Sequence, residues 1–172
     1  MLQNYLVYNM ECEKPKVYLE TSIPSYLTAW PSRDLIKAAN QQITHEWWQL
    51  REKFELYISQ IVIQEASSGN ENAAFRRLDV LKNVSVLDVS EDSQNLAKEL
   101  LYQNSMPKKA VIDALYIAIS VINGIDYLLT WNCTHIANAF MRKKIEHVCI
   151  NFGYEPTIIC TPNELMEVYN EE

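Results

Sequence analysis

Short apolar segments alternate with longer helical segments along this chain of 172 residues, and this alternation constrains the fold more than any other feature. The apolar segments, read as strands, are 16–20 (KVYLE), 55–59 (ELYIS), 85–89 (SVLDV), 127–131 (YLLTW) and 157–160 (TIIC). Helical patterns fill the intervals at about 32–53, 60–68, 71–82, 90 onward, 107–123 and 134–152, and a last short helix follows 161. Strands that alternate with helices form βαβ units, which build a parallel sheet with helices on both faces. We therefore expect an α/β fold, a three-layer α/β/α sandwich with a short central parallel sheet of four to five strands.

Glycines and capping residues predict where the helices end and begin. The chain has three glycines, Gly69, Gly124 and Gly153, and each follows a helical pattern. A glycine at this position adopts the left-handed conformation that ends a helix. Ser90 is expected to cap an acid-rich helix start, and Pro107 is expected to open the helix that ends at Gly124.

Composition indicates one globular domain. Apolar types make up 48% of the residues and the net charge is −7, which excludes a broadly basic nucleic-acid-binding protein. The length fits a single domain, which we place at 16–172 with residues 1–15 as an N-terminal appendage. No apolar stretch reaches the ~18 residues that span a bilayer, and no basic region precedes one, so we expect a cytoplasmic protein without membrane contact. Four scattered cysteines without a CxxC pair argue against a disulfide framework or a zinc site.

Two predicted strands end in residues that can carry chemistry. Glu20 follows the first strand and Asn132 follows the fourth, and α/β proteins bind ligands beyond the carboxyl ends of their strands. Glu20 can also be an ordinary exposed strand end, and Asn132 can simply cap the helix that follows it. The neighbouring hydroxyl residues Thr21, Ser22, Thr130 and Thr134 have the same capping alternative.

Two further acids lie on predicted helices. Glu65 comes three and four residues after Val62 and Ile61, so it shares their apolar face unless it sits at a boundary that reaches water. Asp113 lies near the start of a helix that is apolar around most of its circumference, where the helix dipole favours the ionised carboxylate. A carboxylate on a core-facing stripe needs a cation, a hydrogen-bond network or a metal.

Three acids and one amide can therefore converge at one end of the sheet. Oxygen ligands of this kind suit Mg²⁺ or Mn²⁺ rather than zinc. A hard cation held by carboxylates supports phosphodiester hydrolysis, since it acidifies water and neutralises charge on the phosphate.

Four segments carry a resemblance to a known family: VYLETSIPSYL (17–27), YISQIVIQEASSG (57–69), KKAVIDALYIAISVINGIDYLLTWNCTHIANA (108–139) and IICTPNELM (158–166). In this order they resemble the PIN-domain ribonucleases, especially the VapC-type toxins of bacterial and archaeal toxin–antitoxin pairs. The resemblance implies a PIN-like sandwich with clustered acids, cleavage of RNA, a homodimer, and a small antitoxin that blocks the groove.

The resemblance also implies roles for individual residues. The family acids fall at Glu20, where Asp is more usual, at Glu65 and at Asp113. The fourth position, commonly Asp, is Asn132. Glu20 and Asp113 would be the main metal ligands, and Glu65 would be a ligand or the base for the attacking water. Asn132 would bind a water molecule that is coordinated to the metal. The supporting positions beside them are Thr21 or Ser22, Thr130 and His135. Three carboxylates rather than four favour one tightly held ion.

The net negative charge means that RNA must be gripped locally. The candidate clusters are Lys108 with Lys109, Arg142 with Lys143 and Lys144, and Arg76 with Arg77. Each cluster can equally be solvated helix surface. The early helix mixes apolar and polar positions as an interface helix would, while Trp47 and Trp48 within it are expected in the core or an interface.

Two other functions compete with a ribonuclease. A degenerate PIN domain that binds RNA or a protein without cleaving is favoured by Asn132, which supplies no charge. A magnesium-dependent phosphatase of the HAD type would need a nucleophilic Asp after the first strand, where this chain has Glu20 and no DxDx(T/V) pattern.

Overall fold

A five-stranded sheet forms the centre of the computed structural model, which describes residues 13–103 and 105–167. The strands are β1 (Lys16–Leu19), β2 (Glu55–Ser59), β3 (Ser85–Leu87), β4 (Tyr127–Leu129) and β5 (Ile158–Cys160). Their order is β3-β2-β1-β4-β5, and every neighbouring pair is parallel. The predicted parallel sheet is therefore confirmed, and all carboxyl ends of the strands lie at one edge.

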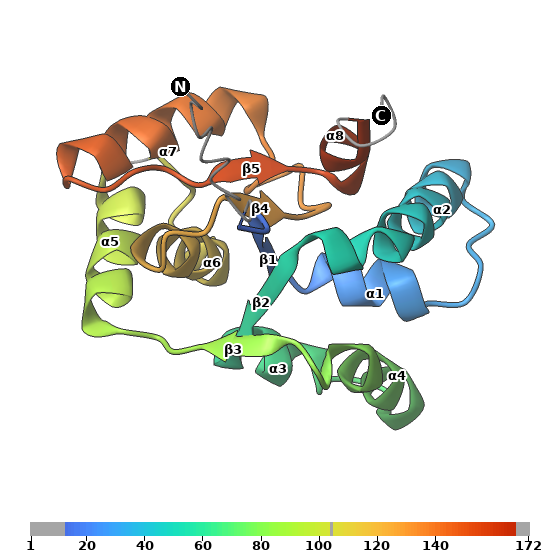
Figure 1. Cartoon of the computed structure of the whole chain (residues 1–172). Coiled ribbons are helices and arrows are strands. Elements are labelled where there is room, and N and C mark those ends of the chain that lie inside the picture. Colours follow the sequence, from blue (N-terminus) through green and yellow to red (C-terminus); the bar gives the residue numbers. More distant parts are fainter. Residues whose placement is uncertain (1–12, 104, 168–172) are drawn as a thin grey trace, which may run out of the picture.

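Helices cover both faces of this sheet, which confirms the three-layer arrangement (Figure 1). They are α1 (Ser22–Thr28), α2 (Leu35–Gln49), α3 (Gln60–Ala66), α4 (Glu71–Leu81), α5 (Glu91–Tyr102), α6 (Val111–Ile122), α7 (Ala139–Asn151) and α8 (Pro162–Glu167). Figure 1 shows α5 and α6 on one side of the sheet and α1 and α2 on the other. Helix α7 packs against α5, α8 packs against α2, and α4 packs against α1.

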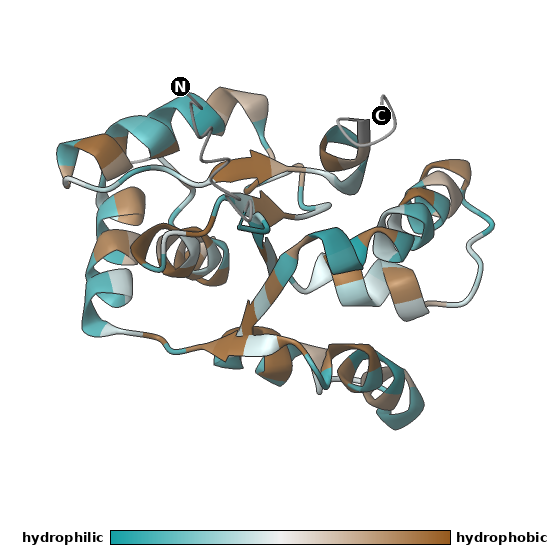
Figure 2. Ribbon diagram, viewed as in Figure 1, coloured by the Kyte–Doolittle hydropathy of each residue, from teal (hydrophilic) through white to brown (hydrophobic). Residues whose placement is uncertain are grey.

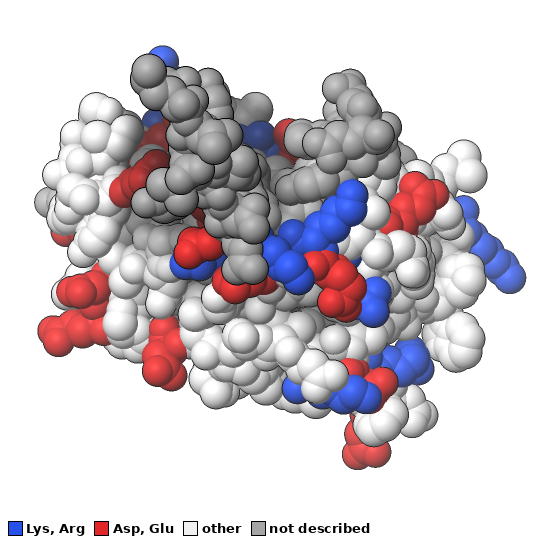
Figure 3. Space-filling model, in the orientation of Figure 1, with Lys and Arg blue, Asp and Glu red and all other residues white. Residues whose placement is uncertain are grey.

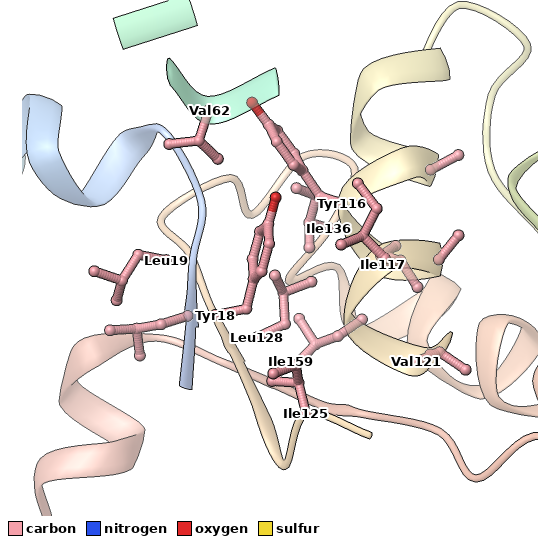
Figure 4. Close-up of a cluster of buried hydrophobic side chains, with 14 of the residues drawn as sticks. Tyr18, Leu19, Val62, Tyr116, Ile117, Val121, Ile125, Leu128, Ile136 and Ile159 are labelled. Carbon is pink, nitrogen blue, oxygen red and sulfur yellow. The ribbon is translucent and has the colours of Figure 1, made fainter. Parts of the chain in front are cut away.

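The central strand β1 lies inside the hydrophobic core. Val17, Tyr18 and Leu19 are fully buried between β2 and β4, as expected for a parallel strand covered on both faces. Hydrophobic residues are concentrated on α6 and on the strands β4 and β5 (Figure 2). The close-up in Figure 4 shows that the core extends from β1 and β4 to α3 and α6. This packing fixes the strand ends, and with them the residues that follow.

The three glycines end helices as predicted. Gly69, Gly124 and Gly153 have φ angles of 85°, 60° and 81°, in the left-handed region that a side chain disfavours. The capping role of Ser90 is also confirmed, because its side chain accepts a hydrogen bond from the backbone N–H of Ser93.

Three helix starts differ from the sequence prediction. Helix α1 at Ser22–Thr28 was not predicted, because its seven residues include a proline and no side-chain cap. Helix α6 begins at Val111 rather than at Pro107, since residues 107–110 form a turn closed by a hydrogen bond from the Ala110 N–H to the Pro107 carbonyl. Helix α7 begins at Ala139 rather than at residue 134, because Asn138 is its cap. The later starts of α6 and α7 leave non-helical backbone at 107–110 and 130–138, directly before each helix.

The N-terminal appendage predicted for 1–15 falls mostly outside the described residues, which begin at 13. Pro15 already joins the sheet, because its carbonyl accepts a hydrogen bond from the Glu55 N–H. Among the described residues, no helix combines the length and the apolar character needed to cross a membrane.

Candidate active site

Glu20 lies at the carboxyl end of the central strand, and the sheet itself holds it there. Its backbone N–H donates to the Leu129 carbonyl of β4 at 3.2 Å. The residue is only 6% exposed, and two hydroxyl groups donate to the same carboxylate oxygen, Oε2. Ser22 Oγ donates at 2.5 Å and Thr130 Oγ1 at 2.8 Å. The hydroxyls of Ser22 and Thr130 therefore bind the acid in this structure.

Burial raises the pKa of the Glu20 carboxyl, and the nearby negative charge of Asp113 raises it further. Hydrogen bonds from Ser22 and Thr130 oppose this rise in pKa, because they stabilise the ionised form. An ionised Glu20 at this depth forms no ion pair with a Lys or Arg among residues 13–103 and 105–167.

Glu65 comes from α3 and is exposed, so the sequence expectation that it faces the core with Val62 was wrong. The short helix α3 turns Ile61 and Val62 inward and leaves Glu65 at the boundary. Its carboxylate is nevertheless held, because Thr21 Oγ1 donates to Oε2 at 2.7 Å and the Tyr116 hydroxyl donates to the same oxygen. Glu65 is therefore an exposed acid with a fixed orientation.

Asp113 lies in the first turn of α6 and is bound through both oxygens. Asn132 Nδ2 donates to Oδ1 at 3.1 Å, and His135 Nδ1 lies 2.9 Å from Oδ2. The Asn132 amide oxygen accepts a hydrogen bond from the His135 backbone N–H, so Asn132 caps a turn and orients Asp113 with the same side chain. Both roles need the loop before α7 to stay non-helical.

The structure brings the four predicted site residues into one network at the carboxyl edge. Asn132, which binds Asp113, also donates its backbone N–H to Thr130 Oγ1 at 2.8 Å, and Thr130 donates to Glu20. Thr21, the chain neighbour of Glu20, extends the network to Glu65. Asp113 lies close enough for its negative charge to raise the pKa of Glu20.

The donor set fits a hard divalent cation. Glu20, Glu65 and Asp113 offer carboxylate oxygens. In both glutamates, Oε2 is the oxygen that accepts the hydrogen bonds from neighbouring side chains. In residues 13–103 and 105–167, no group of three or more His, Cys, Asp or Glu side chains could hold a metal ion in the present arrangement. Two observations support a bound cation at this site. The donors are carboxylate oxygens, and no Lys or Arg among the described residues neutralises the buried Glu20 carboxylate.

Tyr116 is a site residue that the sequence analysis missed. It was counted with the apolar circumference of α6, yet its hydroxyl reaches Glu65 and Thr21. Burial, and after it the bond to Glu65, raises the pKa of Tyr116, so its hydroxyl stays protonated and remains a donor. Its position three residues after Asp113, on the same helix face, was the signal that could have identified it.

The basic candidates are dispersed around the molecule. Figure 3 shows basic and acidic side chains interspersed on one face rather than gathered in a basic patch. Lys108 and Lys109 are exposed in the turn directly before α6, next to the edge that carries Asp113. Arg142 pairs with Glu164 at 3.3 Å, whereas Lys143 and Lys144 are exposed on α7.

Arg76 and Arg77, the third basic cluster, bind the protein itself. Arg76 stacks on the Trp30 ring with 5.3 Å from Cζ to the ring centroid and donates to the Thr28 carbonyl. Arg77 donates to the Ala66 carbonyl at 2.9 Å. These contacts engage both guanidinium groups, whereas Lys108 and Lys109 are exposed and precede Asp113 by five and four residues.

Solved structures that share this fold include two toxin structures. VapC20 from Mycobacterium tuberculosis, described as a sarcin–ricin loop cleaving toxin, aligns with a TM-score of 0.52 and 18% identity, over 65% of this chain and 86% of that one. VapBC2 from Rickettsia felis, bound to a DNA fragment from their promoter, aligns with a TM-score of 0.51 and 18% identity, over 85% of this chain and 98% of that one. No curated protein matches the sequence.

The sequence profile of the PIN domain matches residues 17–132. The match begins in β1, includes Glu20, Glu65 and Asp113, and ends at Asn132, so it contains all four predicted site residues, whereas His135 lies just beyond it. Because this match covers more than half of the sequence, the chain belongs to the PIN-domain family.

Proposed function

We propose that this chain is a metal-dependent endoribonuclease that hydrolyses RNA phosphodiester bonds, and that it is the toxin of a toxin–antitoxin pair. The observation that carries the proposal is the network that joins Glu20, Asp113 and Glu65 at the carboxyl edge of the sheet. PIN-domain nucleases generally depend on a divalent metal ion. The likeness to a toxin whose title states cleavage of the sarcin–ricin loop supports RNA as the substrate class.

Glu20, Glu65 and Asp113 are the residues that would hold Mg²⁺ or Mn²⁺. When bound, the ion supplies positive charge that stabilises the phosphate oxygens and lowers the pKa of water. Asn132 and His135 orient Asp113, and Ser22 and Thr130 orient Glu20. Glu65 is exposed, and its Oε1 accepts no hydrogen bond from the residues that the structure describes. That oxygen is available to accept a proton from the attacking water.

The substitution Asp113→Asn tests this function. It keeps the shape of the side chain but removes one charge, so we expect metal-dependent RNA cleavage to fall by at least ~1,000-fold, in the range of losses for essential catalytic groups. The melting temperature in EDTA should stay close to that of the wild type. Glu52→Gln is a matched control, because it removes a charge from an exposed residue before β2, at the other end of the strands. Unchanged cleavage by the Asp113 variant would contradict the proposal.

A second candidate function is an RNA- or protein-binding module without cleavage. Asn132 favours it, because an uncharged residue stands where the family usually has an acid, and its amide group donates to Asp113. Calorimetry with Mn²⁺, followed by RNA cleavage with and without EDTA, separates the two functions. Binding of RNA without metal-dependent cleavage would favour the second.

We extend the proposal to an antitoxin partner and a homodimer. Trp30, Leu35, Ile36 and Phe75 are large apolar side chains that are 71–86% exposed. Trp30 and Phe75 line one hollow of about 620 Å³, and exposed apolar surface of this kind is typical of protein interfaces. Light scattering of the chain alone, and with the product of the adjacent reading frame, tests both partners. A monomer that binds no neighbouring product would contradict this extension.

A further inference from the structure

Tyr116 places a hydroxyl group at the boundary between the core and the site. Its side chain is 1% exposed, and its ring packs against that of Tyr18 with a centroid distance of 6.0 Å and a tilt of 51°. Figure 4 shows that the Tyr116 ring lies among core residues of α6 and that its hydroxyl points toward α3. Packing therefore fixes the ring, and the ring fixes the position of its oxygen.

Three oxygens from three helices meet at this hydroxyl. Tyr116 Oη donates to Glu65 Oε2 and lies 2.6 Å from Thr21 Oγ1, and Thr21 Oγ1 lies 2.7 Å from the same Glu65 oxygen. Thr21 is the N-cap residue of α1, but its side chain makes no capping hydrogen bond and is directed to Glu65 instead. The contact thus joins α1, α3 and α6 at one carboxylate oxygen.

We propose that Tyr116 is a positioning residue that, together with Thr21, holds Glu65 in its working orientation. This inference rests on the proposed function. A glutamate on an exposed helix surface samples many rotamers, and ordering it costs conformational free energy. Two donors on one oxygen restrict those rotamers before any ligand binds, and they leave Oε1 directed away from the protein donors. Preorganised side chains of this kind support metal binding and catalysis.

Tyr18 provides a matched comparison within the same core. It is also a buried tyrosine, but its hydroxyl pairs with Ser59 Oγ at 2.6 Å rather than with a site acid. Tyr18→Phe and Tyr116→Phe therefore remove the same atom from neighbouring buried rings. A purely structural role for Tyr116 would make the two variants behave alike.

The first test compares Tyr116→Phe and Tyr18→Phe with the wild type. For Tyr116→Phe we expect kcat for RNA cleavage to fall about 10-fold to 100-fold and the dissociation constant for Mn²⁺ to rise, as for other groups that orient metal ligands. KM for RNA should change less than about 3-fold, because Tyr116 is 1% exposed and its hydroxyl contacts Thr21 and Glu65. Tyr18→Phe should leave kcat and the Mn²⁺ affinity close to the wild-type values.

The second test is a double-mutant cycle of Tyr116→Phe with Glu65→Gln. If Tyr116 acts through Glu65, adding Tyr116→Phe to Glu65→Gln should change neither the Mn²⁺ affinity nor kcat further. Thr21→Ser should retain activity and Thr21→Val should lose part of it, because only serine keeps the second hydroxyl.

The outcomes separate this inference from the proposed function. A wild-type chain that binds Mn²⁺ and cleaves RNA, with a Tyr116→Phe variant equal to it, would overturn the positioning role alone. The positioning role would also be overturned if Tyr116→Phe lowered kcat and the Mn²⁺ affinity equally in the wild type and in the Glu65→Gln variant. A wild-type chain that neither binds Mn²⁺ nor cleaves RNA would overturn both.

Discussion

The Glu20 carboxyl group links the site to the stability of the protein. Burial, followed by the charge of Asp113, raises its pKa above the ordinary value of 4.5. Between these two pKa values the folded state binds a proton that the unfolded state releases, so the free energy of unfolding falls as pH rises through this window. The ionised acid therefore costs stability at neutral pH when no cation is bound.

Glu20→Gln removes this cost while keeping an oxygen that can accept from Ser22 and Thr130. We expect the variant in EDTA to be more stable than the wild type at neutral pH, because it carries no buried negative charge at this position. The difference should shrink as pH falls toward 4.5, the ordinary pKa. Urea denaturation at a series of pH values measures it, and a difference that does not depend on pH would contradict the assignment.

Glu164→Gln is the control of opposite sign. Although burial acts to raise the pKa of Glu164, hydrogen bonds from Thr161 and Arg142 lower it overall. Glu164 therefore stabilises the fold above the ordinary carboxyl pKa, and this contribution is lost as pH falls through the lowered value. Its glutamine variant should be less stable than the wild type near neutral pH and should approach it in acid.

The location of a site residue was predictable where it follows from the position of that residue at the end of a strand. Glu20 and Asn132 follow strands of a parallel sheet, so their arrival at one edge could be inferred from the alternating pattern. The orientation of Glu65 could not be inferred, because three- and four-residue spacing does not distinguish the centre of an apolar face from its boundary. Tyr116 was not predicted for a related reason. A tyrosine fits an apolar helix face through its ring, so the pattern does not show where its one polar atom points.

Helix α2 shows how adjacent residues of one element can differ in importance. Trp47 is fully buried and stacks on Phe54 with a centroid distance of 5.8 Å. Trp48 is half-buried, and Arg51 lies over its ring. We expect Trp47→Ala to lower the free energy of unfolding by about 3–5 kcal/mol and Trp48→Ala by about 1 kcal/mol. Urea denaturation monitored by circular dichroism measures both, and equal losses would show that the packing face is assigned wrongly.

The elements were predicted best where local signals were strong. The glycine ends of the helices were correct because a positive φ angle is a property of one residue. Helix α1 was missed because its stability comes from burial of Ile23, Pro24 and Leu27 rather than from its own sequence. Helix α6 starts late because Ala110 offers no side-chain cap, so Pro107 opens a turn instead.

For the whole molecule, a net charge of −7 opposes binding of RNA, so a few exposed cations must carry a large share of the attraction. We expect the double substitution of Lys108 and Lys109 by Ala to raise KM for RNA about 10-fold at low salt and to reduce the salt dependence of KM, with little change in kcat. Steady-state cleavage at several salt concentrations measures these effects.

The control for this prediction removes the same charge elsewhere. Lys37 on α2 and Lys82 after α4 are exposed, and Lys82 already pairs with Asp79 at 3.1 Å. Their double substitution by Ala should change KM little. If both double variants raise KM for RNA equally, RNA binding depends on the net charge alone, and Lys108 and Lys109 form no local binding site.

The sheet as a whole was predictable in type but not in strand order. Five apolar segments separated by helices imply a parallel sheet, which the structure has. The order β3-β2-β1-β4-β5 is not encoded in the alternation, because several orders bury the same apolar segments equally well. The alternating pattern predicted that the strand ends share one edge, whereas it did not predict that β1 and β4 are neighbours in the sheet.

The hydrogen bond between Thr130 and Glu20 connects positions 110 residues apart. A ribosome must therefore release most of the polypeptide before this hydrogen bond can form, whichever segment folds first. Translation products that stop before the fourth strand would contain Glu20 and Glu65 but lack the groups that complete their surroundings. Premature termination or early proteolysis would thus yield inert fragments rather than partly active ones.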